Sequence, residues 1–363
     1  MQKALNYKNL SKKLIEHKNI LLVSGGSLEK TGFLKKLGNI ESVNFVRFSK
    51  FSENPKLPDV LNGLEIYRNS KATLILVVGG GTAIDIAKLI KFYSESDLVV
   101  EGDFPPKKTI HRPHCELISV PTTFGTGSEA THFAVLYVNH VKHSIADSSI
   151  LPEFYLLDPS LGKSLPLKVK ASTCLDALCQ AIESYWSVGG NEESRSYACK
   201  AIQKIHGNIE DYLDSSLNSE FSNSEIADAA NLAGRAINIS KTTASHALSY
   251  TLTSKFGIPH GHAVALCIRK MLSVIENFSN QEGVGERLEK IYKMLEVKDG
   301  KEAEELFNKF MCLGELETNL TNLGVISSSD IGLIVDGVNT ERLSNHPVKL
   351  IRADLISLFE KSE

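Results

Sequence analysis

The sequence lacks a long apolar run, an excess of charge of either sign and any paired cysteine motif. Its longest apolar runs, such as residues 74–78, fall far short of the ~18 residues that a membrane-spanning helix needs. The first residues contain no apolar segment, so we expect no signal peptide. Lys and Arg number 40 against 43 Asp and Glu, which gives no reason to expect nucleic acid or a membrane as partner. The six cysteines form no CxxC pair, and we expect reduced thiols in a cytoplasmic protein.

The remaining composition is typical of a globular protein with two domains. The chain has 363 residues, of which 42% are hydrophobic and 23% charged. Apolar runs at 19–27, 42–48, 72–78 and 115–123 alternate with amphipathic stretches, which predicts βαβ units and a parallel sheet in an α/β domain over residues 1–159. Pro105, Pro106 and Pro113 indicate a loop before the last of these strands. Helical spacing dominates afterwards and predicts an all-α domain over 160–363, with a polar loop at 215–225.

A glycine turn follows the third predicted strand. Gly79, Gly80, Gly81 and Thr82 stand between an apolar run and the stretch AIDIAKLIKFY, which has the pattern of a helix. Glycines let backbone N–H groups approach an anion closely, and a helix N-terminus adds donors and a positive dipole. These features favour a phosphate site. The spacing G-x-G-x-x-G is absent, however, and a tight turn without a ligand is the alternative.

A second cluster of small and hydroxyl residues, PTTFGTGSEAT at 121–131, follows the fourth predicted strand. Its hydroxyls offer hydrogen bonds and its glycines let a ligand approach the backbone. Loops that follow parallel strands lie at the carboxyl edge of the sheet, where ligands bind in such folds. A ligand-free loop at the sheet end remains the alternative.

Asp176, His246 and His260 in the second half suit a divalent metal. Asp176 and Gln180 are four residues apart and share a helix face, while His246 and His260 lie further along the chain. Carboxylate and imidazole are common metal ligands. A single histidine in a helix is more often a structural residue, so spacing alone leaves both interpretations open.

Five segments together resemble the iron-containing (group III) alcohol dehydrogenase family. They are GGGTAIDIAK (79–88), PTTFGTGSEAT (121–131), LLDP (156–159), ASTCLDALCQAIESYWS (171–187) and HALSYTLTSKFGIPHGHA (246–263), in family order. The resemblance implies the dehydroquinate synthase-like fold, with an N-terminal dinucleotide-binding domain, a helical C-terminal domain and a metal between them. It implies NAD(P)H-linked reduction of an aldehyde to an alcohol, with one divalent metal (Fe, Zn or Mn).

The resemblance also implies roles for individual residues. Cofactor contacts are implied for Gly25, Asn54, Gly79, Gly80, Gly81, Thr82, Asp85, Thr122, Thr123, Ser128 and Lys142. Metal ligands are implied at Asp176, His246 and His260, with Gln180 at the position where the family usually carries a further histidine. Tyr250 stands where many members carry a proton-relaying histidine, and we expect Tyr250 and His262 to be catalytic. Gly25 stands where NADH-preferring members carry Asp, which favours NADP(H) because no carboxylate repels a 2′-phosphate.

Within the family, the segments at 233–266 and 338–348 look most like the phosphonoacetaldehyde reductase branch. A dianionic phosphonate needs cations, and Arg235, Lys241 and Arg342 are the candidates for substrate binding. The alternatives are an alcohol dehydrogenase for an uncharged alcohol or diol, a metal-independent reductase, a lyase-like enzyme that uses NAD transiently, and a nucleotide-binding protein without turnover. We also expect a small-molecule substrate and a homodimer.

Overall fold

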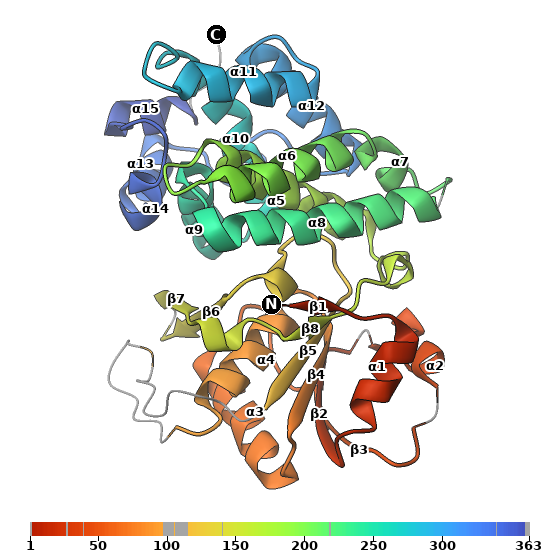
Figure 1. Cartoon of the computed structure of the whole chain (residues 1–363). Helices are drawn as coiled ribbons and strands as arrows, with labels where there is room; N and C mark the ends of the chain where they lie inside the picture. Colours follow the sequence, from red (N-terminus) through yellow and green to blue (C-terminus); the bar gives the residue numbers. More distant parts are fainter. Residues whose placement is uncertain are drawn as a thin grey trace. The chain divides into compact units, whose positions relative to one another are not determined.

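The chain forms two compact units in a computed structural model, which describes residues 2–26, 28–38, 40–96, 105, 115–139, 141–217, 219–338 and 340–359 (Figure 1). The first unit comprises Met1–Thr123 and Gly127–Ser164, and the second comprises Phe124–Thr126 and Leu165–Glu363. Across the part of the chain that is described, no helix is long and apolar enough to cross a membrane.

The first unit is built on a six-stranded sheet in the order β1-β8-β5-β4-β2-β3, and every pair in it is parallel. Its strands are β1 (Lys3–Ala4), β2 (Asn19–Ser24), β3 (Asn44–Phe48), β4 (Leu74–Gly79), β5 (Glu116–Pro121) and β8 (Phe154–Tyr155). A separate antiparallel hairpin joins β6 (Phe133–Val138) to β7 (Val141–Ala146). The sheet carries the fold class expected from the alternating apolar runs.

Helices cover both faces of this sheet (Figure 1). Along β2, Leu21 and Val23 pack with α3 (Leu57–Ser70) and α4 (Gly81–Tyr93), whereas Ile20 and Leu22 pack with α1 (Tyr7–Leu14) and α2 (Phe33–Leu37). Burial on both faces explains why β2 and β4 are continuous apolar runs rather than alternating ones.

The four expected strands are confirmed as β2, β3, β4 and β5. The strands β1 and β8 have only two residues each, too short for any periodicity to be visible in the sequence. The loop expected around Pro105 and Pro113 lies outside the described residues except for Pro105 itself.

The second unit is helical in its described residues. It comprises α5 (Leu167–Trp186), α6 (Glu192–His206), α7 (Ile209–Leu213), α8 (Glu220–Ser240), α9 (Ala244–Phe256), α10 (His260–Glu276), α11 (Val284–Leu295), α12 (Gly300–Leu313), α13 (Ser328–Asp336), α14 (Thr340–Ser344) and α15 (Arg352–Ser357). The helix α5 packs against α6, α8 and α10 and is buried on nearly all sides (Figure 1).

One sequence expectation in this unit is wrong. The polar stretch 215–225 is not a loop throughout, because α8 begins at Glu220. The side chain of Ser219 accepts a hydrogen bond from the backbone N–H of Ser222, and such a cap stabilises a helix start even in a polar sequence. The repeated serines that suggested a loop therefore act in part as a helix cap.

Candidate functional site

Three polar residues lie on one face of the buried helix α5. Asp176, Gln180 and Glu183 are spaced four and three residues apart, and each is at most 4% exposed. Burying polar side chains costs free energy unless each finds a partner, so this face of α5 requires an explanation beyond packing.

Two histidines from other helices reach this face. His246 lies in the first turn of α9, and its Nε2 is 3.3 Å from Oδ1 of Asp176. His260 is the first residue of α10, and its ring centroid is 5.5 Å from that of His246. One potential ligand atom each from Asp176, His246 and His260 lies within 4.8 Å of the other two. The residues that the sequence predicted as metal ligands therefore converge.

Glu183 orients the first of these histidines. Its Oε2 is 2.5 Å from Nδ1 of His246, while the backbone N–H groups of Thr243 and Ser245 donate to its two oxygens at 3.0 and 2.7 Å. Burial by itself raises the pKa of the Glu183 carboxyl, but His246 and the bonds from Thr243 outweigh burial and lower the pKa to about 2. The ionised carboxylate accepts the Nδ1 proton, which turns Nε2 of His246 toward Asp176.

A glycine allows the two helices to approach at this point. A Cβ atom on Gly261 would lie 1.9 Å from the backbone oxygen of Ser172 and 2.8 Å from Cβ of Asp176. Only glycine therefore lets the start of α10, and with it His260, approach α5 so closely.

The buried oxygen and nitrogen atoms of this cluster fit a divalent cation. Oδ1 of Asp176, Oε1 of Gln180 and Nε2 of His246 are buried and make no hydrogen bond among the described residues. Nε2 of Gln180 donates to the backbone oxygen of Thr126 at 3.4 Å, which leaves the amide oxygen available as a ligand. Burial raises the pKa of the Asp176 carboxyl, but His246, His260 and Gln180 outweigh it and lower the pKa. The carboxylate is therefore ionised, as a metal ligand must be.

Tyr250 and Arg342 lie next to the cluster. The ring of Tyr250 stacks on that of His260, with centroids 6.0 Å apart and an interplanar angle of 24°. Its hydroxyl is hydrogen-bonded to Arg342 of α14. Burial raises the pKa of this hydroxyl and Arg342 partly opposes the rise, so Tyr250 is protonated at neutral pH. Arg342, from a distant segment of the chain, is thus separated from the candidate metal ligand His260 only by the side chain of Tyr250.

The other residues predicted near the metal make different contacts. Nε2 of His262 is 2.7 Å from the backbone oxygen of Glu317. Arg235 donates to Asn231 and lies over the ring of Tyr197, and Lys241 forms an ion pair with Glu341 at 2.6 Å. The catalytic role of His262 and the substrate contacts of Arg235 and Lys241 stay predictions. The observed contacts with Glu317, Asn231, Tyr197 and Glu341 give these predictions no support.

In the first unit, the glycine turn 79–82 joins β4 to α4. Gly80 caps α4, so the unpaired N–H groups of the first helical turn begin here. A Cβ atom on Gly79 would lie 2.7 Å from that of Ala83, and one on Gly80 would lie 3.0 Å from Oγ1 of Thr123. The backbone N–H of Thr122 donates to Gly79 at 3.0 Å, so the two predicted loops meet at one sheet edge. This geometry suits an anion, and the contacts of the turn with the cofactor stay a prediction.

The loop at Asn54 and the strand at Lys142 approach the same hairpin residue. Asn54 has a positive φ of 61°, and the carbonyl of the following Pro55 accepts from the backbone N–H of Tyr137 at 2.7 Å. Tyr137 is paired with Lys142 across the hairpin. The structure therefore brings the segments of Asn54 and Lys142 to the same hairpin residue, and for both residues the family resemblance implies contacts with the cofactor.

Asp85 and Ser128 belong to a buried polar cluster. Oγ of Ser128 donates to Asp85 at 2.5 Å, and the backbone N–H of Val135 donates to the same carboxyl at 3.0 Å. The ammonium of Lys88 donates to Ser128 and Thr131 at 3.1 and 2.9 Å. Because these bonds fix the loop after β5 on α4, the observed contacts of Asp85 and Ser128 are structural, and their contact with a cofactor stays a prediction.

Sequence reasoning missed Arg47 on β3. Its guanidinium donates to Ser24 at 2.9 Å and to the backbone oxygen of Gly25 at 3.0 Å, and it pairs with Glu29. Arg47 thus lies beside Gly25, the glycine that follows β2 in place of a carboxylate. No local motif marks Arg47, since the relation depends on strand pairing between β2 and β3.

Both units of the chain match models of one protein family. The profile of iron-containing alcohol dehydrogenases matches residues 2–159, and that of the C-terminal region of Fe-containing alcohol dehydrogenases matches 170–362. The chain belongs to the iron-containing alcohol dehydrogenase family. As a member, it is an NAD(P)-dependent alcohol dehydrogenase or aldehyde reductase, and the donor set around Asp176 and His246 fits the metal of that family.

Three relatives of this iron-containing alcohol dehydrogenase illustrate the range of the family. Long-chain-alcohol dehydrogenase 1 of Geobacillus thermodenitrificans is 27% identical over 94% of the chain and 89% of its own length. Phosphonoacetaldehyde reductase of Streptomyces viridochromogenes is 31% identical over 61% of the chain and 58% of its own length. The structure of sulfoacetaldehyde reductase from Bifidobacterium kashiwanohense in complex with NAD+ is 26% identical, with a TM-score of 0.84 over 97% of this chain and 92% of that one.

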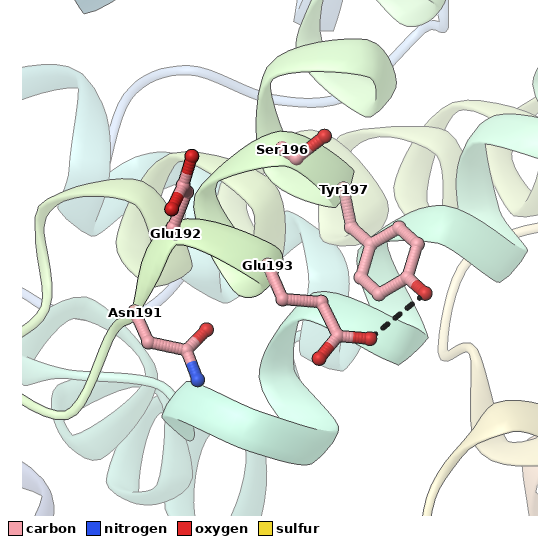
Figure 2. A pocket seen from close by; sticks show the side chains of 5 residues that line it. All are labelled: Asn191, Glu192, Glu193, Ser196 and Tyr197. Atoms are coloured by element: carbon pink, nitrogen blue, oxygen red, sulfur yellow. Dashed lines mark hydrogen bonds between the residues drawn. The ribbon is translucent and has the colours of Figure 1, made fainter.

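A surface hollow elsewhere on this alcohol dehydrogenase is separate from the predicted site. A cavity of about 510 Å³ at the start of α6 is lined by Asn191, Glu192, Glu193, Ser196 and Tyr197 (Figure 2). None of these residues is among the predicted cofactor, metal or substrate contacts, and the acidic lining does not suit an anionic substrate.

Proposed function

We propose that this enzyme reduces an aldehyde that carries a phosphonate group, with phosphonoacetaldehyde giving 2-hydroxyethylphosphonate. The observation that carries the proposal is the convergence of Asp176, His246 and His260, with ligand atoms within 4.8 Å, beside the Tyr250–Arg342 pair. Together with Gln180, these three residues would hold one divalent metal.

Reduction adds a hydride to the carbonyl carbon and a proton to the carbonyl oxygen. A dihydronicotinamide would supply the hydride, and a metal held by these residues would supply Lewis-acid polarisation of the carbonyl. The chain must supply the proton. Tyr250 is protonated at neutral pH and lies against His260, so we assign its hydroxyl as the proton donor, with Arg342 stabilising the phenolate that forms.

The preference for an anionic aldehyde rests on Arg342. A guanidinium recognises a phosphonate through charge-assisted, bidentate hydrogen bonds, and Arg342 is the cation next to Tyr250. Two relatives are named for aldehydes that carry a phosphonate or a sulfonate, and both anions present tetrahedral oxygens to a binding site. This shared chemistry supports an anionic substrate over an uncharged alcohol or diol.

We also propose NADP(H) as the preferred cofactor. The residue at the end of β2 is Gly25 and not a carboxylate, and the guanidinium of Arg47 bonds to its carbonyl oxygen. An arginine beside this position can accept a 2′-phosphate, whereas a carboxylate would repel it. The pair with Glu29 would have to open for Arg47 to bind the phosphate.

The test is a comparison of aldehydes with and without the anionic group. We expect kcat/KM with NADPH to be at least tenfold higher for phosphonoacetaldehyde than for propanal. Arg342→Met should lower kcat/KM for phosphonoacetaldehyde roughly 10- to 100-fold, a loss of about 1–3 kcal/mol for a charge-assisted bond, and should lower kcat/KM clearly less for propanal, which loses only the support that Arg342 gives to the Tyr250 phenolate. Arg352→Met, which removes a cation paired with Asp336 and is not a predicted substrate contact, is the matched control. Equal rates for the two aldehydes would refute the phosphonate assignment.

A second candidate is a metal-independent reductase on the same fold. Gln180 favours it, because an amide at this position replaces an imidazole and weakens binding of late transition metals. Removal of the metal separates the two candidates.

A further inference from the structure

The turn between α8 and α9 has a strained backbone. Lys241, which follows the last residue of α8, has φ 60° and ψ 176°, a conformation that is essentially restricted to glycine. A non-glycine residue stays in this region only where the surrounding structure holds it. The next two residues lead into α9 and the metal ligand His246.

Asn345, from the segment after α14, holds this turn on both sides of Lys241. Its Nδ2 donates to the backbone oxygen of Ser240 at 2.8 Å and to that of Thr242 at 3.0 Å. Its Oδ1 accepts from the backbone N–H of Gly189 at 2.9 Å. Asn345, which is more than 100 residues from Ser240 in sequence, therefore ties the turn to the segment that follows α5.

His346 contacts the next residue of the turn. Its Nδ1 is 3.3 Å from Oγ1 of Thr243, and that oxygen also accepts from Nε1 of Trp186 at 3.0 Å. The hydroxyl proton of Thr243 goes to Glu183 at 2.8 Å, so both nitrogens must donate to Thr243. His346 accordingly carries a proton on Nδ1, and the ring is neutral at pH 7 because burial lowers its pKa to about 4. The ring packs edge-on against Trp186.

These contacts form one continuous chain to the metal site. Thr243 donates to Glu183 through both its backbone N–H and its hydroxyl, and Glu183 fixes the ring of His246. All members are buried except Asn345, which is partly buried. The position of the 240–243 turn thus determines how Glu183, and through it His246, is oriented.

We propose that Asn345 and His346 are positioning residues that set the metal affinity of the site through Thr243 and Glu183. This inference rests on the metal site of the proposed function. It assigns a role to a segment that touches no ligand. Outer partners of a metal ligand raise its basicity and reduce the freedom that is lost on binding, and removing one typically costs 10- to 100-fold in affinity.

A purely structural role would make a different prediction. If Asn345 and His346 only stabilise the fold, their loss would lower the melting temperature and leave the dissociation constant for the metal unchanged. The two roles therefore separate in a measurement of metal binding by the folded protein.

The test is competition of full-length protein with a chromophoric chelator for Zn²⁺, with the d–d spectrum of the Co²⁺-loaded protein as a second readout. Asn345→Asp keeps the acceptor for Gly189 but loses both donated bonds, and His346→Leu loses the bond to Thr243. We expect each to weaken Zn²⁺ binding about tenfold and to alter the Co²⁺ spectrum. His346→Asn, which keeps an N–H near the Nδ1 position, should restore most of the affinity.

Ser327→Ala is the matched control. It removes the side-chain cap of α13 and leaves the 240–243 turn intact. We expect it to lower the melting temperature but to keep the dissociation constant within twofold of wild type. Unchanged affinity in Asn345→Asp and His346→Leu, with melting temperatures lowered as in Ser327→Ala, would overturn the positioning role alone. A wild-type protein that binds no divalent ion would overturn the metal site as well, so the two failures are distinguishable.

Linkage supplies an independent readout. If the segment sets metal affinity, metal must stabilise the segment to the same extent. We expect Zn²⁺ to slow amide hydrogen exchange in the peptide that covers residues 340–348, and equal exchange with and without Zn²⁺ would contradict the coupling.

Discussion

Oε2 of Glu183 lies 2.5 Å from Nδ1 of His246, and the opposite nitrogen of the same ring lies 3.3 Å from Oδ1 of Asp176. The imidazole of His246 therefore lies between two carboxylates. Glu183 accepts a hydrogen bond from Nδ1, and Asp176 lies next to Nε2 on the other side of the ring. An arrangement of this kind leaves Nε2 available for a cation, since Glu183 fixes the tautomer.

Replacing Glu183 with Gln should weaken metal binding 10- to 100-fold. The amide keeps the shape of the side chain, but its NH₂ group cannot accept the bonds that Thr243, Ser245 and His246 now donate. Competition with a chelator measures the loss. Glu193→Gln, which alters only a bond to Tyr197 on α6, should leave the affinity unchanged. Equal affinities in the two variants would argue against an orienting role for Glu183.

Gln180→His should strengthen the site. It introduces an imidazole four residues after Asp176, and imidazole binds late transition metals better than an amide does. We expect at least tenfold tighter Zn²⁺ binding, measured by the same competition. Gln180→Leu, which has similar volume and no ligand atom, should bind more weakly than wild type. If Gln180→Leu protein bound Zn²⁺ as tightly as wild type or more tightly, the amide oxygen of Gln180 would not be a ligand.

Gly261→Ala should damage both stability and the metal site. The new Cβ would lie 1.9 Å from the backbone oxygen of Ser172, so α10 must shift and carry His260 away from Asp176. We expect a loss of about 1–3 kcal/mol in the free energy of unfolding together with weaker metal binding. Gly332→Ala in α13, where the nearest atom would be 3.6 Å away, should be neutral or stabilising by up to about 1 kcal/mol. A tolerated alanine at 261 would contradict the close approach.

His346 should make stability depend on pH between 6.5 and 4. Burial lowers the pKa of His346 from 6.5 to about 4, although Glu183 opposes the shift. Between these values the unfolded chain binds a proton that the folded chain does not, so stability falls as the pH falls. At pH 4.5 the loss is about 2 kcal/mol relative to pH 7.5. His346→Asn in metal-free protein should lack this part of the loss, as measured by urea unfolding at both pH values. Equal acid sensitivity in both proteins would contradict a buried neutral ring.

The sequence predicted the parallel sheet for physical reasons, whereas the set of metal ligands was implied by the resemblance to the family. Strands such as β4 are apolar on both faces, and the i, i+4 spacing of Asp176 and Gln180 is visible without coordinates. Glu183 is also spaced so that it shares this face of α5, yet a carboxylate in a helix more often faces solvent. Only the burial of α5 shows that it does not.

Contacts between distant segments were not predictable in the same way. Arg47 meets Gly25 through strand pairing, and Asn345 meets the 240–243 turn through tertiary packing. Neither relation leaves a local pattern. The strain at Lys241 is equally invisible, because lysine is an ordinary residue in sequence and becomes exceptional only through its φ of 60°.

The most direct test of this account is NADPH oxidation with phosphonoacetaldehyde by protein whose metal has been removed with a chelator and then restored. We predict that removal abolishes activity and that one Zn²⁺, Fe²⁺ or Mn²⁺ per chain restores it, whereas Asp176→Asn protein stays inactive after the same treatment. Full activity in protein that contains no bound ion would contradict the central claim.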